Sequence, residues 1–209
     1  MTRRFLPALL LLSAACLAQA QFTPANSPIK ITAISPTLEK TPEFNIGIGP
    51  QRKAASQDWL WVEVAYTYTW KLNTPPPSEI TVDYYILLDN KSRATPQGTL
   101  LTGSVTHTGV VPGNEVHHSV ALVSPQTLRS MFGGRAPATI SAATRAIGVQ
   151  VKIQGALAGE LSTGDGKGHS QWWQQLPQGP GGLVLSKDQT PFAPLFYDYF
   201  DAVKAKGAQ

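Results

Sequence analysis

Residues 59–70 read WLWVEVAYTYTW, and this stretch decides the fold class. Every second residue from Leu60 to Trp70 is apolar or aromatic, whereas most residues between them are polar or small. Successive side chains of a β-strand point to opposite faces, so this period of two predicts a long strand with one face in a core. Trp59 and Trp61 fall on the opposite face of the same strand.

Strand-like segments recur along the whole chain, separated by turn residues such as those of the Pro112-Gly113-Asn114 run. The segments that we predict as strands are 29–34, 43–48, 59–70, 80–88, 100–108, 115–123, 143–153 and 183–186. Many short strands with few helices are typical of an immunoglobulin-like antiparallel β-sandwich. We therefore predict a mainly β chain in which residues 21–209 form a single sandwich domain.

Two helices are predicted within this domain. Ser124 followed by Pro125 is a typical helix start, and Gly133-Gly134 ends that helix after about two turns, so a short helix should cross between the sheets. The second helix runs from about residue 191 to Lys204, where apolar residues follow a three-and-four spacing. Its aromatic stripe consists of Phe192, Leu195, Phe196, Tyr199 and Phe200. This stripe either packs against its own sandwich or docks onto another protein.

The first twenty residues have the layout of a secretory signal peptide, with Arg3 and Arg4 before an apolar run and Ala18-Gln19-Ala20 as a cleavage site. Cleavage would lower the formal charge from +4 to +2 and would remove Cys16, the only cysteine. Lipidation of Cys16 is an alternative, because the residues before it resemble a shifted lipoprotein box. No later stretch is long and apolar enough to be a transmembrane segment.

Motifs for catalysis, cofactors or metals are missing. There is no nucleophile elbow, the Gly164–Gly168 run lacks the pattern of a phosphate loop, and no cysteine remains after cleavage. A hairpin centred on Pro112-Gly113 would place His107 opposite His118, but two imidazoles do not make a selective metal site. We expect a polar pair there, no metal, no cofactor and no enzymatic activity.

Tryptophans give the clearest binding signal in the sequence. The candidates for exposed aromatic side chains are Trp59, Trp61, Trp172 and Trp173. They would either pack structurally, contact a protein, or stack on sugar rings as in a carbohydrate-binding module for mucin-type glycans. Nucleic acid is excluded as a partner, because the basic residues are scattered singly and form no patch for phosphates.

The closing string TPFAPL at residues 190–195, followed by FYDYF and then by Ala202, Val203 and Lys204, resembles the ending of a family of small secreted proteins of Verrucomicrobia such as Akkermansia. The genes of that family lie beside type IV pilus genes, so its members are described as pilus-like or pilus-associated. The resemblance implies an immunoglobulin-like sandwich without catalytic residues. A pilin proper is not expected, because the N-terminal apolar run is short and lacks an acidic residue.

Together these features predict a non-enzymatic protein that is exported to the periplasm, outer membrane or cell surface. It would act through protein contacts, with pilus or envelope assembly proteins as partners and with self-association left open. Binding of mucin-type glycans by a sandwich module is the alternative function.

Overall fold

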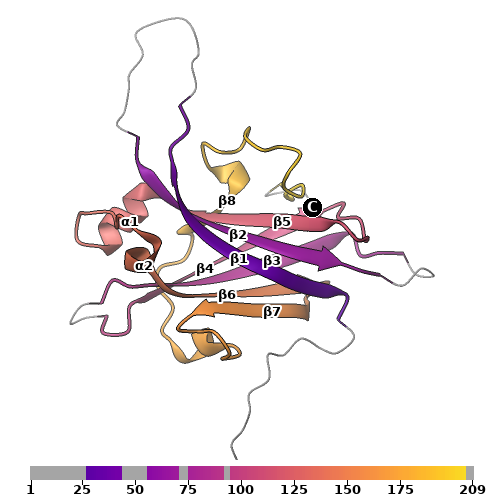
Figure 1. Cartoon of the computed structure of the whole chain (residues 1–209), viewed down its shortest axis with the longest axis horizontal. Helices are drawn as coiled ribbons and strands as arrows, with labels where there is room; N and C mark the ends of the chain where they lie inside the picture. The colour runs from indigo at the N-terminus through magenta and orange to yellow at the C-terminus, as the bar shows by residue number, and fades with distance from the viewer. Residues whose placement is uncertain (1–26, 44–55, 71–74, 92–94, 206–209) are drawn as a thin grey trace, which may run out of the picture.

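The computed structural model describes residues 27–43, 56–70, 75–91 and 95–205, and within them two antiparallel sheets stack face to face (Figure 1). Sheet A has the strand order β1-β2-β5-β8, and sheet B has the order β4-β3-β6-β7. The bounds in sheet A are β1 Ile29–Lys40, β2 Asp58–Tyr68, β5 Val116–Val123 and β8 Val184–Ser186. Those in sheet B are β3 Glu79–Leu88, β4 Thr99–Thr108, β6 Thr144–Ile153 and β7 Ala156–Gly164. The predicted mainly β sandwich is confirmed.

The core lies between the two sheets and follows the alternation seen in the sequence. Apolar residues at every second position of β2 and β3 point inward, and the tyrosines Tyr66, Tyr68 and Tyr84 are completely buried among them. Burying each large side chain contributes roughly 1.5–3 kcal/mol to folding, so these two central strands supply much of the stability.

Seven of the eight predicted strands are confirmed, with shifts at their ends. The first extends beyond residue 34 to Lys40. The segment predicted at 43–48 lies, beyond Glu43, outside the described residues. Strand β7 was not predicted, because its small and polar residues give little alternation. Gln154 and Gly155 both have positive φ angles, so a tight two-residue turn pairs β7 with β6.

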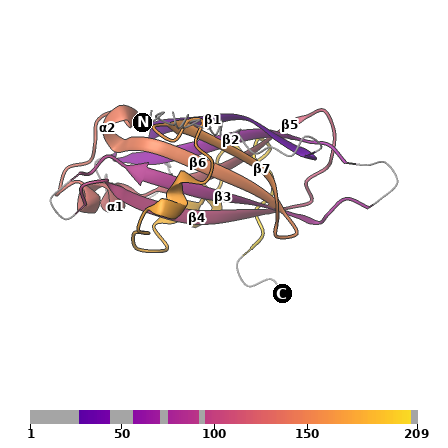
Figure 2. The same cartoon turned by 90° about the horizontal axis from the view of Figure 1, so that it is seen from below.

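The short crossing helix is confirmed as α1 (Pro125–Met131), whose first turn is capped by the Ser124 hydroxyl at 3.1 Å from the Thr127 amide. A further turn of helix, α2 (Ile140–Ala143), follows it before β6 begins. The two helices lie at the same end of the sandwich and carry the chain from sheet A to sheet B (Figure 2). Two 3-10 turns, η1 (Trp172–Gln175) and η2 (Lys187–Gln189), complete the described elements. None of the described helices is long and apolar enough to cross a membrane.

The predicted C-terminal helix is wrong. Residues 190–205, which we call the C-terminal segment, form a series of turns instead. The Ala193 amide donates to the Thr190 carbonyl, and the Leu195 amide donates to the Phe192 carbonyl, so these bonds close four-residue turns. Pro194 has no amide hydrogen and Phe196 has a left-handed backbone with φ +53°, and both features prevent a continuous helix.

The predicted hairpin around Pro112-Gly113 is also wrong, because β4 belongs to sheet B and β5 to sheet A. His107 of β4 lies opposite Ile80, and His118 of β5 lies opposite Ala65. His107 points into the core, whereas His118 lies on the outer face of sheet A, so the two imidazoles do not form a pair.

Candidate functional site on the C-terminal segment

The outer face of sheet A carries an aromatic cluster that the C-terminal segment covers. Trp59 and Trp61 of β2 are only 9% and 6% exposed, because Phe192 packs edge-on against both rings, at centroid distances of 5.7 and 5.3 Å. The indole nitrogen of Trp59 also donates to the Thr41 hydroxyl at 3.0 Å. The predicted exposure of these two tryptophans is therefore wrong.

The outer face of sheet B has its own cover, formed by η1 and the residues before it. Trp173 is buried and stacks on Tyr85, with ring centroids 4.2 Å apart, and a Cβ atom at Gly148 would overlap its ring. Trp172 is half-buried and donates its indole hydrogen to the Ser162 hydroxyl at 3.1 Å. The exposure predicted for Trp173 is wrong, and Trp172 is only partly accessible.

The carboxylate of Asp201 holds the C-terminal segment in place. It accepts a hydrogen bond from the Tyr66 hydroxyl at 2.8 Å and lies 3.0 Å from Nδ1 of His117. Burial raises the pKa of Tyr66 strongly, and the nearby Asp201 raises it further, so the phenol stays protonated and donates. We call these three residues the Asp201 anchor.

Main-chain bonds add to this anchor and tie the two sheets together. The Asp201 amide donates to the His118 carbonyl of β5, and the Thr108 amide of β4 donates to the Ala202 carbonyl. The Lys204 amide then donates to the Thr106 carbonyl at 2.7 Å. The segment therefore bridges edge groups of β4 and β5, which belong to different sheets.

A buried Ser–His pair lies beneath the anchor. Nε2 of His107 is 2.6 Å from the Ser119 hydroxyl, and its Nδ1 is 3.1 Å from the main-chain oxygen of Asp201. Burial lowers the pKa of His107, so the ring is neutral near pH 7. Ser119 is completely buried and also accepts a hydrogen bond from Tyr84, so this pair does not present a nucleophile to a substrate.

In the part of the chain that the structure describes, no group of three or more His, Cys, Asp or Glu side chains is arranged to hold a metal ion. The histidines near the C-terminal segment are instead engaged with Asp201, Ser119 and, for His118, with Glu63 at 2.9 Å.

The predicted stripe of five residues is divided by the turns of the C-terminal segment. Phe192 is buried, Leu195 and Phe200 are half-buried, and these three hold the segment on sheet A. Phe196 and Tyr199 remain 62% and 50% exposed.

Tyr197 is 81% exposed and was missed, because it falls off the helical stripe. Phe196, Tyr197 and Tyr199 form what we call the exposed aromatic patch. Tyr199 is fixed in it by stacking on His118 at a centroid distance of 4.1 Å and by donating its hydroxyl hydrogen to Glu63 at 2.8 Å.

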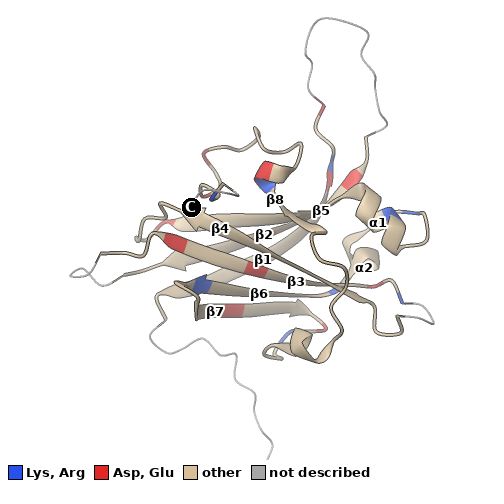
Figure 3. Cartoon of the chain, turned by 180° about the vertical axis from the view of Figure 1, so that it is seen from behind, with Lys and Arg blue, Asp and Glu red and all other residues tan. Residues whose placement is uncertain are grey.

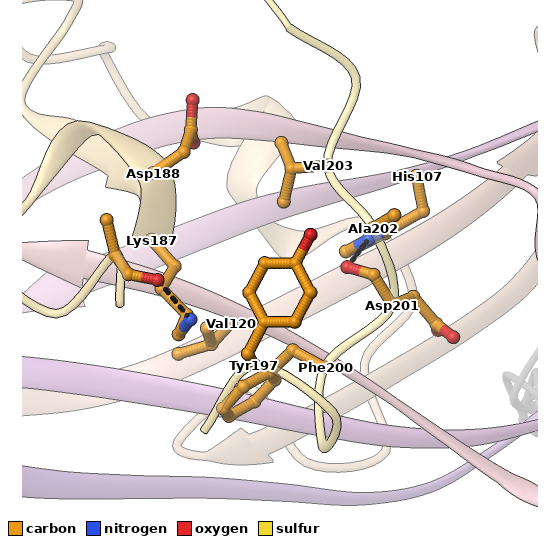
Figure 4. Close-up of a pocket in the computed structure, with 10 residues that line it drawn as sticks. His107, Val120, Lys187, Asp188, Tyr197, Phe200, Asp201, Ala202 and Val203 are labelled. Atoms are coloured by element: carbon orange, nitrogen blue, oxygen red, sulfur yellow. Dashed lines mark hydrogen bonds between the residues drawn. The ribbon is translucent and has the colours of Figure 1, made fainter. Parts of the chain in front are cut away.

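A pocket of about 240 Å³ lies beside the patch, between the C-terminal segment, η2 and the facing strands β4 and β5 (Figure 4). Its lining residues are His107, Val120, Lys187, Asp188, Ala193, Tyr197, Phe200, Asp201, Ala202 and Val203. Spacing along the sequence gives no sign of it, because the lining comes from four separate parts of the chain.

The model of one protein family matches residues 20–207, which is nearly the whole chain beyond the predicted signal peptide. The chain belongs to that family. Its fold is similar to that of a protein from Akkermansia muciniphila whose crystal structure has been solved, with a TM-score of 0.67 at 20% sequence identity. That match covers 86% of this chain and 94% of the other, so the two share the sandwich over most of their length.

No curated protein matches the chain. The link to Verrucomicrobia that the C-terminal string indicated fits the Akkermansia match. At 20% identity the structural match shows a common fold alone.

Proposed function

We propose that this is an exported, non-enzymatic protein of the cell envelope that binds other proteins in or near a type IV pilus-like system. The similar Akkermansia protein is pilus-associated, which supports this setting. The predicted signal peptide lies outside the described residues and supports export to the periplasm, outer membrane or cell surface. Pilus or envelope assembly proteins are the proposed partners.

The exposed aromatic patch is the observation that carries this proposal. Phe196, Tyr197 and Tyr199 are 62%, 81% and 50% exposed, so a large part of each ring is accessible to a partner. Tyrosine and phenylalanine are enriched at the buried centres of protein interfaces, where a few aromatic side chains supply most of the affinity. Three such rings within four consecutive positions are therefore suited to dock into a partner.

The patch is also pre-organised by what lies beneath it. Phe192 and Phe200 fix the segment against Trp61, and the Asp201 anchor fixes its far end. Phe196 keeps a left-handed backbone that costs of order 1 kcal/mol or more and persists only where the surroundings impose it. Side chains that are already ordered lose little entropy on binding, which favours a specific contact.

Affinity capture from envelope extracts tests the proposal, with a Phe196→Gly/Tyr197→Ala double variant compared with the wild-type chain. The double variant should recover far less of any pilus or envelope assembly protein, because both rings are removed while the buried rings remain. Val111→Ala is the matched control, since Val111 is 71% exposed and lies outside the C-terminal segment. Equal recovery by a folded double variant would contradict the patch as the contact site.

The glycan-binding alternative depended on exposed tryptophans. Trp59, Trp61 and Trp173 are buried, so the observation that favoured sugar stacking is no longer present. We therefore propose no second function.

A further inference from the structure

Lys187 carries a buried positive charge that the described residues do not neutralise. The residue is only 7% exposed, yet no described carboxylate oxygen lies within 4.0 Å of its ammonium nitrogen. Nζ donates to the Ala193 carbonyl at 2.9 Å and lies 5.7 Å from the centre of the Phe200 ring. Burying a charge without an opposite charge is costly, and an anion bound at Nζ would offset this cost.

The pocket beside the patch gives Lys187 access to a ligand. Val120, Phe200 and Val203 provide apolar walls, and the ring of Tyr197 lies across the opening (Figure 4). A volume of about 240 Å³ is near the lower end for small-molecule sites, so it suits a compact group of amino-acid size.

Two acidic residues, Asp188 and Asp201, line the pocket, but neither pairs with Lys187, so the inner wall stays positively charged. The Asp201 carboxylate is occupied by Tyr66 and His117, and in Figure 4 it points away from the pocket. Asp188 is exposed, accepts a hydrogen bond from the Ser186 hydroxyl, and directly follows Lys187 in η2. Figure 3 shows acidic and basic residues together on the turn that follows β8. Burial lowers the pKa of Lys187, whereas Asp188 raises it, which fits an ammonium group that is short of a close counter-charge.

We propose that this pocket binds a monocarboxylate with a compact apolar body, whose carboxylate pairs with Nζ of Lys187. A single lysine matches one negative charge. A phosphate dianion would need further donors and would meet the Asp188 carboxylate at the rim. The same chemistry is offered by a free aromatic or aliphatic acid and by the C-terminal carboxylate of a polypeptide that ends in an apolar residue.

Titrations of the isotope-labelled mature chain, followed by amide resonances in NMR, test this proposal. The probes are phenylacetate, its neutral amide phenylacetamide, and the peptide Gly-Gly-Phe with a free or an amidated C-terminus. We expect the charged probes to shift the resonances of Lys187, Ala202 and Val203, and the neutral probes to bind about tenfold more weakly. Tighter binding of the free peptide than of phenylacetate would support the polypeptide source, and the reverse order would support a free acid.

Lys187→Met keeps the length of the side chain and removes its charge, and it should weaken phenylacetate binding by about tenfold. Lys167→Met is the matched control, because Lys167 is exposed on the turn after β7 and should leave binding unchanged. If Lys187→Met does not fold, Tyr197→Ala opens the pocket from its exposed side and should alter the affinity without unfolding the chain. Equal affinity for the acid and the amide, or no shift of the lining resonances at millimolar probe, would overturn the proposal.

The pocket does not depend on the proposed protein contact. Tyr197 belongs to the patch and also lines the pocket, whereas Phe196 belongs to the patch alone. Loss of capture by the single variant Phe196→Gly therefore tests the contact, and the charge dependence of probe binding tests the pocket, so either proposal can fail alone.

Discussion

The two outer faces of the sandwich are covered in different ways. On sheet B, Trp173 stacks on Tyr85, and the carboxylate of Glu160 accepts hydrogen bonds from the Gln171 amide, the Ser170 hydroxyl and the Gln150 side chain. On sheet A, Phe192 covers Trp59 and Trp61, but the same segment leaves three aromatic rings exposed and encloses Lys187, which forms no ion pair with a described carboxylate. One cover is therefore closed and satisfied, whereas the other has surface and charge left for a ligand. This difference places the candidate function on sheet A.

The largest expected effects come from removing the central ring of each cover. Phe192→Ala and Trp173→Ala should each lower the free energy of unfolding by about 3–5 kcal/mol, because each leaves a cavity against buried aromatic rings. Urea unfolding followed by tryptophan fluorescence measures both. Only Phe192→Ala should also weaken partner capture, so a matching loss of capture in Trp173→Ala would break the distinction between the covers.

The next effects come from the carboxylates that fasten each cover. Asp201→Ala leaves the Tyr66 hydroxyl and His117 without their partner, and Glu160→Ala leaves three hydrogen-bond donors without theirs. Each variant should therefore lower the free energy of unfolding by about 1.5–3 kcal/mol. Amide hydrogen exchange shows which residues are destabilised in each variant. Faster exchange should be confined to residues 195–205 in the first variant and to residues 169–176 in the second, and a uniform increase in both would show that the covers are not independent.

Lowering the pH should destabilise the packing of the C-terminal segment on sheet A, because His107 lies beneath this segment. Burial lowers its pKa from the ordinary value of 6.5, with Asp201 opposing this shift and His117 adding to it. The unfolded chain therefore binds this proton more readily than the folded chain does. The contribution of His107 to the free energy of unfolding is complete above about pH 6.5 and falls as the pH is lowered, by at most about 1.4 kcal/mol per pH unit. Unfolding curves at pH 7.5 and 5.5 should differ less for His107→Gln than for wild type.

The exposed His169, next to the cover of sheet B, supplies the control for that measurement. His169→Gln should keep the full dependence on pH. A wild-type stability that does not change between the two pH values would contradict the role given to His107.

The smallest effect on stability is expected at the patch. Phe196→Gly and Tyr197→Ala should each change the free energy of unfolding by no more than about 0.5 kcal/mol, because both rings are largely exposed. In Phe196→Gly, the left-handed backbone is no longer strained, and this gain in stability offsets part of the stability lost with the Trp61 contact. Thermal unfolding measures the change in stability. A large loss of stability in either variant would mean that the patch helps to hold the C-terminal segment on sheet A.

Much of the sandwich could be predicted, because alternation reports directly which residues face a core. That signal found β2 and β3 and placed Tyr66, Tyr68 and Tyr84 inside. It failed at β7, where small residues alternate weakly, and at Trp59 and Trp61, because alternation separates two faces without telling whether the outer face is later covered. Three-and-four spacing likewise fitted residues 192–203, although Pro194 and the backbone of Phe196 forbid a helix there.

The sequence by itself determined the class of fold and the position of the C-terminal aromatic residues, since both depend on local periodicity and turn chemistry. Tertiary structure alone decided which of those aromatics are buried, which sheet each strand joins, and that Lys187 meets a pocket. These outcomes depend on contacts between distant segments. Asp201 meets Tyr66 across 135 positions and His107 across 94, and no local pattern encodes such a meeting.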